Sequence, residues 1–192
     1  MRIVTWNING VQVRTDRLLA FLESAQPDVL VLQELKAPTD DFPYDVVRAA
    51  GYEAAVRGDG RWNGVAILSR VGLDDVTYDL PAQPQWDGVT EPRAIAATCD
   101  GVRVWGVYVP NGRTIDDPHY AYKLEWLAAL RETAVAEIAA APERPWAVLG
   151  DFNVAPTDAD VWDIAQFADS THVTPAERAA VTALTDSGLV EV

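Results

Sequence analysis

The 192-residue chain has little cysteine, lysine or histidine, and it has no long apolar run. Its only cysteine, Cys99, excludes a disulfide within the chain and a zinc site built from cysteines. No apolar stretch approaches the ~20 residues of a membrane-spanning helix. The first residues, MRIVTWNING, do not show the ordered regions of a signal peptide. We therefore expect a cytoplasmic location, where a single reduced cysteine is ordinary.

Positive charge is also scarce. The formal net charge is -14, and Lys36 and Lys123 are the only lysines. This balance argues against tight nonspecific binding of a polyanion by the surface as a whole. It leaves room for a local basic site, or for carboxylates held together by a divalent cation. Arginine suits bidentate phosphate contacts, but a general compositional bias is the simpler explanation for the preference for arginine over lysine.

The length and the hydrophobic pattern predict one domain over residues 1–192, built from alternating strands and helices. The expected strands lie at residues 2–6, 27–34, 53–57, 64–69, 73–79, 93–99, 102–109 and 146–150. The expected helices cover residues 15–25, 43–50, 116–142 and 174–187, with Thr15 or Asp16, Asp116 or Asp117, and Thr174 as N-terminal caps. Because some strands follow one another directly, the pattern favours an α/β layered fold with mixed or largely antiparallel sheets.

Four of the expected apolar strands end in a carboxylate, an amide or a phenol. The side chains at or just beyond these ends are Asn7 and Asn9, Gln33 and Glu34, Tyr108 and Asn111, and Asp151 and Asn153. Asp and Asn are ordinary turn residues, which is the simplest reading of each end taken alone. Glu34 is not a turn former, so that reading fails there. If the four ends share one rim, they form an oxygen-rich site for a cation beside a phosphate.

The ligand types indicate the metal. Carboxylate and amide oxygens without histidine or cysteine suit Mg²⁺, with Mn²⁺ as the alternative. Mg²⁺ keeps several waters and shares its coordination shell with substrate phosphates, so one or two protein carboxylates are enough.

Five motifs occur in order along the chain: TWNING, LQELK, NGVAILSR, VYVPNGR and GDFNVAPTD. On these motifs the chain resembles the exonuclease III family of apurinic/apyrimidinic endonucleases, within the endonuclease–exonuclease–phosphatase superfamily. The resemblance runs from Met1 to Val192. It implies a four-layer α/β/β/α sandwich, with two sheets face to face and helices outside. LQELK together with YVPNG favours the DNA-repair branch over the phosphatase branches.

The resemblance also implies an activity and the residues that perform it. The activity is Mg²⁺-dependent hydrolysis of phosphodiesters 5′ to abasic sites in double-stranded DNA, and removal of nucleotides or blocking groups from DNA 3′ ends. Glu34 would be the principal metal ligand, Asp151 would prepare the attacking water, and Asn153 would orient that water and stabilise the phosphate. The implied sets are Asn7, Glu34, Asp151 and Asn153 for the metal, Tyr108, Asp151 and Asn153 for catalysis, and Asn9, Lys36, Asn111 and Arg113 for DNA.

Members of the resembled family continue beyond the stretch that matches TDSGLVEV. The continuation carries another catalytic aspartate, aromatic residues for the abasic sugar and a terminal Ser-Asp-His motif, none of which this chain contains. We therefore expect a C-terminally truncated member whose second sheet is incomplete, with an exposed edge. Two alternatives stay open: a phosphoesterase acting on small or lipid phosphates, and a catalytically incomplete DNA-binding fragment.

Several other residues have two possible interpretations each. Four tryptophans in strand or helix patterns are expected in the core, whereas Trp62 in the GDGRWNG loop is a candidate for DNA contact. Arg93 is either a solvated residue at a strand start or a counterpart of a family residue. Lys36 either orients the metal-site carboxylates or is a surface lysine. We expect His119 to be structural or exposed, and the sequence offers no partner for His172.

Overall fold

The computed structural model describes residues 1–192, which form two compact units. Unit 1 consists of Met1–Asp79, Glu91–Tyr108 and Glu143–Asp151, and unit 2 of Leu80–Thr90, Val109–Pro142 and Phe152–Val192. The single domain expected over residues 1–192 stays a prediction beside this division.

Unit 1 contains two four-stranded sheets. The first has the order β1-β2-β4-β3 and consists of β1 (Ile3–Asn7), β2 (Val29–Gln33), β4 (Val65–Ser69) and β3 (Glu53–Arg57). The second has the order β5-β6-β7-β8 and consists of β5 (Asp74–Tyr78), β6 (Ala94–Cys99), β7 (Val102–Tyr108) and β8 (Trp146–Asp151). The pairs β1–β2 and β7–β8 are parallel and the others antiparallel, so both sheets are mixed, as the sequence predicted.

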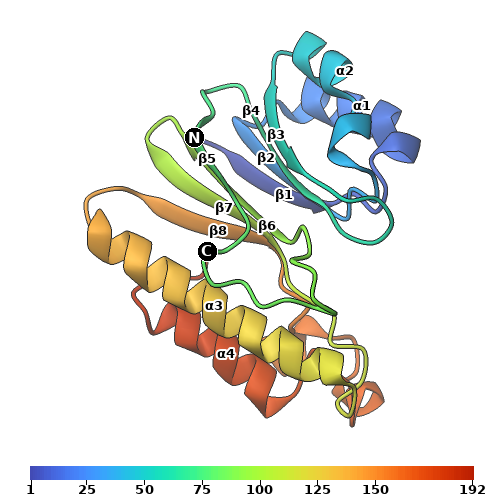
Figure 1. Cartoon of the computed structure of the whole chain (residues 1–192), viewed down its shortest axis with the longest axis vertical. Helices are drawn as coiled ribbons and strands as arrows, with labels where there is room; N and C mark the ends of the chain where they lie inside the picture. Colours follow the sequence, from blue (N-terminus) through green and yellow to red (C-terminus); the bar gives the residue numbers. More distant parts are fainter. The chain divides into compact units, whose positions relative to one another are not determined.

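The central strand β2 explains the layering of unit 1. All five of its residues are buried, as expected of a strand that is covered on both faces. Leu30 and Leu32 pack in one cluster with residues of α1 (Thr15–Ala25) and α2 (Tyr44–Ala49). Val29 and Val31 pack in another cluster with residues of the second sheet. The first sheet therefore lies between a helical layer and the second sheet (Figure 1).

The parallel pairs bring the polar strand ends together. In the register of β1 and β2, Asn7 lies opposite Gln33, and Glu34 follows directly. In β7 and β8, Tyr108 lies opposite Asp151. Parallel strands end at the same edge of a sheet, so each pair delivers its polar side chains to one edge.

Unit 2 is mainly helical. Its helices α3 (Pro118–Ala140) and α4 (Pro175–Thr185) lie side by side in Figure 1. The Asp117 side chain caps α3, and Thr174 caps α4 in a capping box with Glu177. Both caps are as predicted. No helix in the chain combines the length and apolar character needed to cross a bilayer.

The predicted cap of α1 is wrong. The helix begins at Thr15, its N-cap is Arg14, and no side chain makes a capping hydrogen bond. The reason is that a short 3-10 helix, Gln12–Arg14, leads directly into α1, so the chain is already helical at the expected cap. The Thr15 hydroxyl donates back to the Val11 carbonyl instead, at 3.1 Å.

Candidate active site

In unit 1, Asn7 joins two carboxylates from different strand ends. Its Nδ2 donates to Glu34 Oε1 at 2.7 Å and to Asp151 Oδ2 at 2.8 Å. Two carboxylates this near a common group would repel each other, and the shared amide donor offsets that repulsion. The predicted convergence of Asn7, Glu34 and Asp151 on one edge is therefore present.

Tyr108 joins the same cluster. Its hydroxyl donates to Glu34 Oε1 at 3.1 Å. Burial raises the pKa of the Tyr108 phenol, and the negative charge of Glu34 raises it further, against the opposing effect of Arg93. Tyr108 is therefore a neutral hydrogen-bond donor at neutral pH, not a phenolate.

Glu34 is held in its ionised form. Burial opposes ionisation, but hydrogen bonds from Asn7, Lys36 and Tyr108 outweigh it and lower the pKa of the Glu34 carboxyl. Lys36 Nζ lies 2.9 Å from Glu34 Oε2 and also donates to Asn9 Oδ1 at 2.6 Å. Lys36 thus pairs with the Glu34 carboxylate, as its predicted role in orienting that carboxylate requires, and it brings Asn9 to the cluster.

The backbone around Glu34 has an uncommon conformation. Asn9, Glu34 and Lys36 all have positive φ, at 50°, 53° and 50°. A non-glycine residue in this region costs roughly 1–2 kcal/mol, and such residues cluster at functional sites. Backbone hydrogen bonds compensate from both sides: Gly10 N donates to Glu34 O at 2.7 Å, and Lys36 N to Asn63 O at 2.9 Å.

Arg93 contacts both the ring and the backbone carbonyl of Tyr108. It is only 5% exposed, so the solvated reading of this residue is wrong. Its Nε pairs with Glu91 Oε2 at 2.7 Å, and its Nη1 donates to the Tyr108 carbonyl at 3.3 Å. The guanidinium carbon lies 5.0 Å from the centre of the Tyr108 ring, within cation–π range.

The donor set of this cluster fits a hard divalent cation. Asn7 Oδ1 is buried and has no hydrogen-bond partner, which is costly for a polar atom unless something else binds it. With the Glu34 and Asp151 carboxylates it makes an all-oxygen set, the kind Mg²⁺ prefers. No group of three or more His, Cys, Asp or Glu side chains is placed to hold a metal. Two carboxylates and an amide are nevertheless sufficient for Mg²⁺, which keeps several waters.

Unit 2 holds a second cluster, formed by Asn111, Asn153 and His172. His172 Nε2 lies 3.2 Å from Asn153 Oδ1 and 3.2 Å from Asn111 Nδ2. Asn153 Nδ2 also donates to the Val109 carbonyl at 2.9 Å. The two partners of His172 Nε2 could not be predicted, because they lie 19 and 61 positions away and follow no local pattern, whereas Nδ1 lies 2.9 Å from Oγ1 of the adjacent Thr171.

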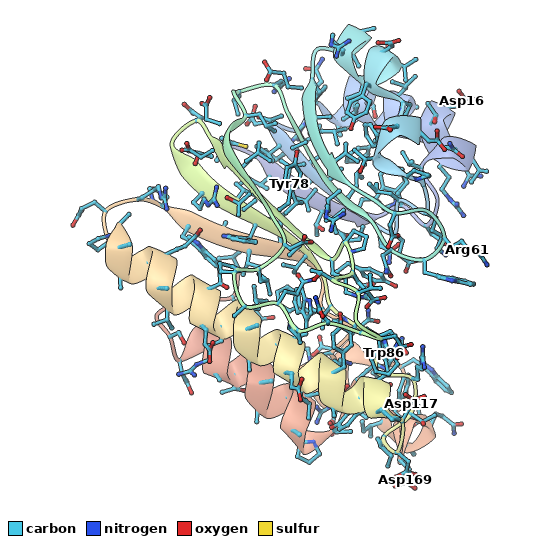
Figure 2. The ribbon with its side chains drawn as sticks, in the orientation of Figure 1. Asp16, Arg61, Tyr78, Trp86, Asp117 and Asp169 are labelled. Atoms are coloured by element: carbon cyan, nitrogen blue, oxygen red, sulfur yellow. The ribbon has the colours of Figure 1, made fainter.

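Arg113 lies next to this cluster. Its backbone N donates to Asn111 Oδ1 at 3.0 Å, and its guanidinium carbon lies 5.1 Å from the centre of the Trp86 ring. Arg113 Nη1 is 3.6 Å from Asp117 Oδ2, and the side chain is 54% exposed. Figure 2 shows Trp86 and Asp117 close together within unit 2. The contact with the Trp86 ring holds the exposed Arg113 side chain in place. No sequence pattern indicated this role for Trp86.

The sequence also led to expectations for His119 and for the tryptophans. His119 is buried and its Nδ1 accepts from Gly112 N at 3.2 Å, so it is structural, one of the two roles expected. Trp105 and Trp126 are fully buried, as expected, whereas Trp6 and Trp146 are half-buried. Trp62 is 70% exposed, as a residue available for DNA contact must be.

The chain is similar in sequence and in fold to several proteins that act on DNA. Exodeoxyribonuclease III of Haemophilus influenzae is 28% identical over 166 residues, which are 84% of this chain and 60% of that protein. The 3′ phosphatase NExo from Neisseria, solved with a product DNA hairpin, is 39% identical and has a TM-score of 0.91. An AP endonuclease from Archaeoglobus fulgidus is 30% identical, with a TM-score of 0.90. The match covers 97% of this chain in both structures, and 71% and 70% of those chains.

These matches confirm the predicted α/β fold with two mixed sheets. They also show a difference in length, because the chain spans less than two thirds of the Haemophilus relative. The model of the Endonuclease/Exonuclease/phosphatase family matches residues 4–188. The chain with this cluster of strand-end oxygens therefore belongs to the endonuclease/exonuclease/phosphatase family.

Proposed function

We propose that the chain is a divalent-metal-dependent hydrolase of phosphate esters in DNA. It would cleave phosphodiesters 5′ to abasic sites, and it would remove nucleotides or blocking groups from DNA 3′ ends. The observation that carries the proposal is the meeting of Asn7, Glu34, Tyr108 and Asp151 at strand ends of unit 1.

Each side chain has a task in this reaction. Asp151 accepts a proton from the attacking water, so that a hydroxide equivalent reaches phosphorus. Asn7 donates to the Asp151 and Glu34 carboxylates and keeps both in place. Tyr108, as a neutral phenol, donates a hydrogen bond at the site. Asn153 is proposed to stabilise the phosphate through its amide, in line with its place two residues after Asp151.

Glu34, Asp151 and the Asn7 oxygen would hold Mg²⁺, or Mn²⁺ in its place. The bound ion would neutralise charge on the phosphate and on the leaving oxygen. Lys36 and Tyr108 would hold the Glu34 carboxylate in position to bind the ion, through contacts of 2.9 and 3.1 Å.

DNA as the substrate rests on the relatives and on the exposed basic groups. The 39% identical relative is described as a 3′ phosphatase and 3′–5′ exonuclease, and the 30% identical relative as an AP endonuclease. Arg113, fixed on Trp86, and Lys36, beside Asn9, are proposed DNA contacts in an otherwise acidic protein. The cytoplasmic location expected from the sequence stays a prediction.

The proposal is tested with a panel of substrates in Mg²⁺. The panel holds a duplex with one abasic-site analogue, a duplex with a 3′ phosphate, a plain recessed 3′ end and a small phosphomonoester. We expect turnover of at least one DNA substrate and none of the small ester. Turnover of the small ester alone would favour the phosphoesterase alternative, and DNA binding without turnover would favour the binding fragment.

A further inference from the structure

Unit 2 contains a fully buried ion pair outside the cluster already described. The side chains of Lys123, in α3, and Glu177, in α4, are both 0% exposed. Lys123 Nζ lies 2.5 Å from Glu177 Oε1. A buried pair of this kind often gives no more stability than apolar residues of the same size, because both charges lose their water. Stability alone is therefore a weak explanation for placing it here.

The lysine holds two loops through their backbones. Lys123 Nζ donates to the carbonyl of Asn111 at 3.2 Å and to the carbonyl of Asn153 at 2.5 Å. These two asparagines end in the cluster with His172 described above. The three hydrogens of one ammonium thus reach one carboxylate and the two loops that carry candidate active-site amides.

The glutamate holds the third loop. Glu177 Oε1 accepts from the backbone N of His172 at 2.9 Å, and its Oε2 accepts from Thr174 N at 3.1 Å. Hydrogen bonds from Lys123, His172 and Thr174 outweigh the effect of burial and lower the pKa of the Glu177 carboxyl. The pair therefore contacts the backbone of all three residues whose side chains meet in the unit 2 cluster.

The packing around the lysine is tight. Gly112 follows Asn111 with φ of +92°, and a Cβ added there would lie 3.1 Å from Lys123 Cδ and 3.3 Å from Thr171 Cγ2. Only glycine allows the Asn111 loop to approach the lysine stem this closely in that conformation.

We propose that Lys123 and Glu177 are positioning residues for the hydrolysis of DNA phosphate esters, an inference that rests on the proposed function. Neither side chain reaches solvent, so neither contacts substrate. Their task is to fix the backbones of Asn111, Asn153 and His172, so that the side-chain amides are aligned before DNA arrives. Misplacing such a group by about 1 Å can cost about 100-fold in rate.

The test separates positioning from stability with a neutral double variant, Lys123→Met with Glu177→Gln. The introduced glutamine keeps an oxygen for the Thr174 capping box, and the double variant leaves no buried charge. We expect the double variant to recover most of the stability that Lys123→Met alone loses. We expect kcat on a DNA substrate to stay reduced by about tenfold or more, with a smaller change in KM.

A second readout is amide hydrogen exchange at residues 111–113 and 153–155. We expect faster exchange there in the double variant than in wild type, with the core strands unchanged. A matched control is the exposed pair Arg48 and Asp45, 73% and 97% exposed, changed to Met and Asn. Neither readout should respond to it.

A double variant with wild-type kcat and wild-type exchange would overturn the inference, because the pair would then serve stability alone. A wild-type chain without DNA turnover would contradict the proposed function instead. The exchange comparison would still show whether the pair holds the three loops.

Discussion

At the scale of single residues, Asp151 carries the most specific chemical claim. Its carboxylate is placed by Asn7 Nδ2 at 2.8 Å, and it ends the strand that pairs with β7. Asn153, two residues on, belongs to unit 2 and is fixed by Val109 and His172. The two neighbouring polar residues at this strand end thus have different partners, as expected if one removes a proton and the other stabilises charge.

Replacement of Asp151 by Asn tests its role as a base. An amide cannot take the proton from water, so we expect kcat to fall by roughly 100- to 10,000-fold. Asn can still accept from Asn7, so the free energy of unfolding should change by less than about 1 kcal/mol. Rates on a 3′-phosphate duplex and urea unfolding measure the two effects. Asp16→Asn, at an exposed position in α1, is the control; equal activity of the Asp151 variant and wild type would exclude the assigned role.

Glu177 predicts a pH dependence of stability. Its pKa is lowered in the folded protein from the ordinary 4.5, because its hydrogen bonds outweigh burial. The stability contributed by the ionised form is therefore fully present above pH 4.5 and is lost as the pH falls through the lower folded pKa.

The measurement is the free energy of unfolding of wild type and Glu177→Gln, by urea titration at a series of pH values. We expect the difference between the two proteins to be constant near neutral pH and to narrow below 4.5. A difference that grew as the pH fell would mean that the pKa of this carboxyl is raised in the folded protein, not lowered.

At the scale of elements, glycine at residue 150 lets β8 end beside β7. Its φ is +154°, and a Cβ there would lie 1.9 Å from the Val107 carbonyl oxygen. Gly150→Ala must therefore move the backbone that carries Asp151. We expect a loss of more than about 1 kcal/mol of unfolding free energy and a fall in activity. Gly51→Ala is the matched control, since φ there is +89° but nothing lies within 4 Å of the added Cβ.

The control variant should lose only the cost of a positive φ, about 1 kcal/mol, and keep its activity. Thermal unfolding and initial rates of the two variants provide the comparison. If both variants behaved alike, the close contact with Val107 would not be what demands glycine at this strand end.

Most element positions could be predicted because hydrophobic periodicity and capping residues act locally. Pro118 with Asp117, and Pro175 with Thr174, correctly marked the starts of α3 and α4. The cap of α1 could not be predicted, because a 3-10 turn before it removes the need for a capping side chain. Strand boundaries agreed within one or two residues, since apolar runs and turn residues define them.

The candidate site was predictable only in part. Four polar strand ends suggested one rim, and the structure brings Asn7, Glu34, Tyr108 and Asp151 together. The left-handed backbone of Glu34 was not predictable, because this segment is held by backbone hydrogen bonds with two other segments, at Gly10 and Asn63. The buried Lys123–Glu177 pair joins residues 54 positions apart, and nothing in the local sequence distinguishes Lys123 from a surface lysine.

At the scale of the whole molecule, the protein has 29 acidic and 15 basic residues. The resulting self-repulsion destabilises the compact state, and salt screens it over about 10 Å at 0.1 M. We expect the melting temperature to rise when sodium chloride is raised from about 0.01 to about 0.2 M at neutral pH. The effect should shrink near the isoelectric point of about 4.4. A melting temperature that fell with salt at neutral pH would mean that attractive ion pairs dominate.

The most direct test of the central claim is the Mg²⁺ dependence of DNA hydrolysis by wild type and Glu34→Gln. The substrate is a duplex with a 3′ phosphate or an abasic-site analogue, and EDTA is the zero-metal point. We predict that EDTA abolishes wild-type turnover, and that the variant needs about tenfold or more Mg²⁺ for half-maximal rate, since it has lost a carboxylate ligand. Turnover that persists in EDTA, or the same Mg²⁺ dependence in both proteins, would contradict a metal site built on Glu34.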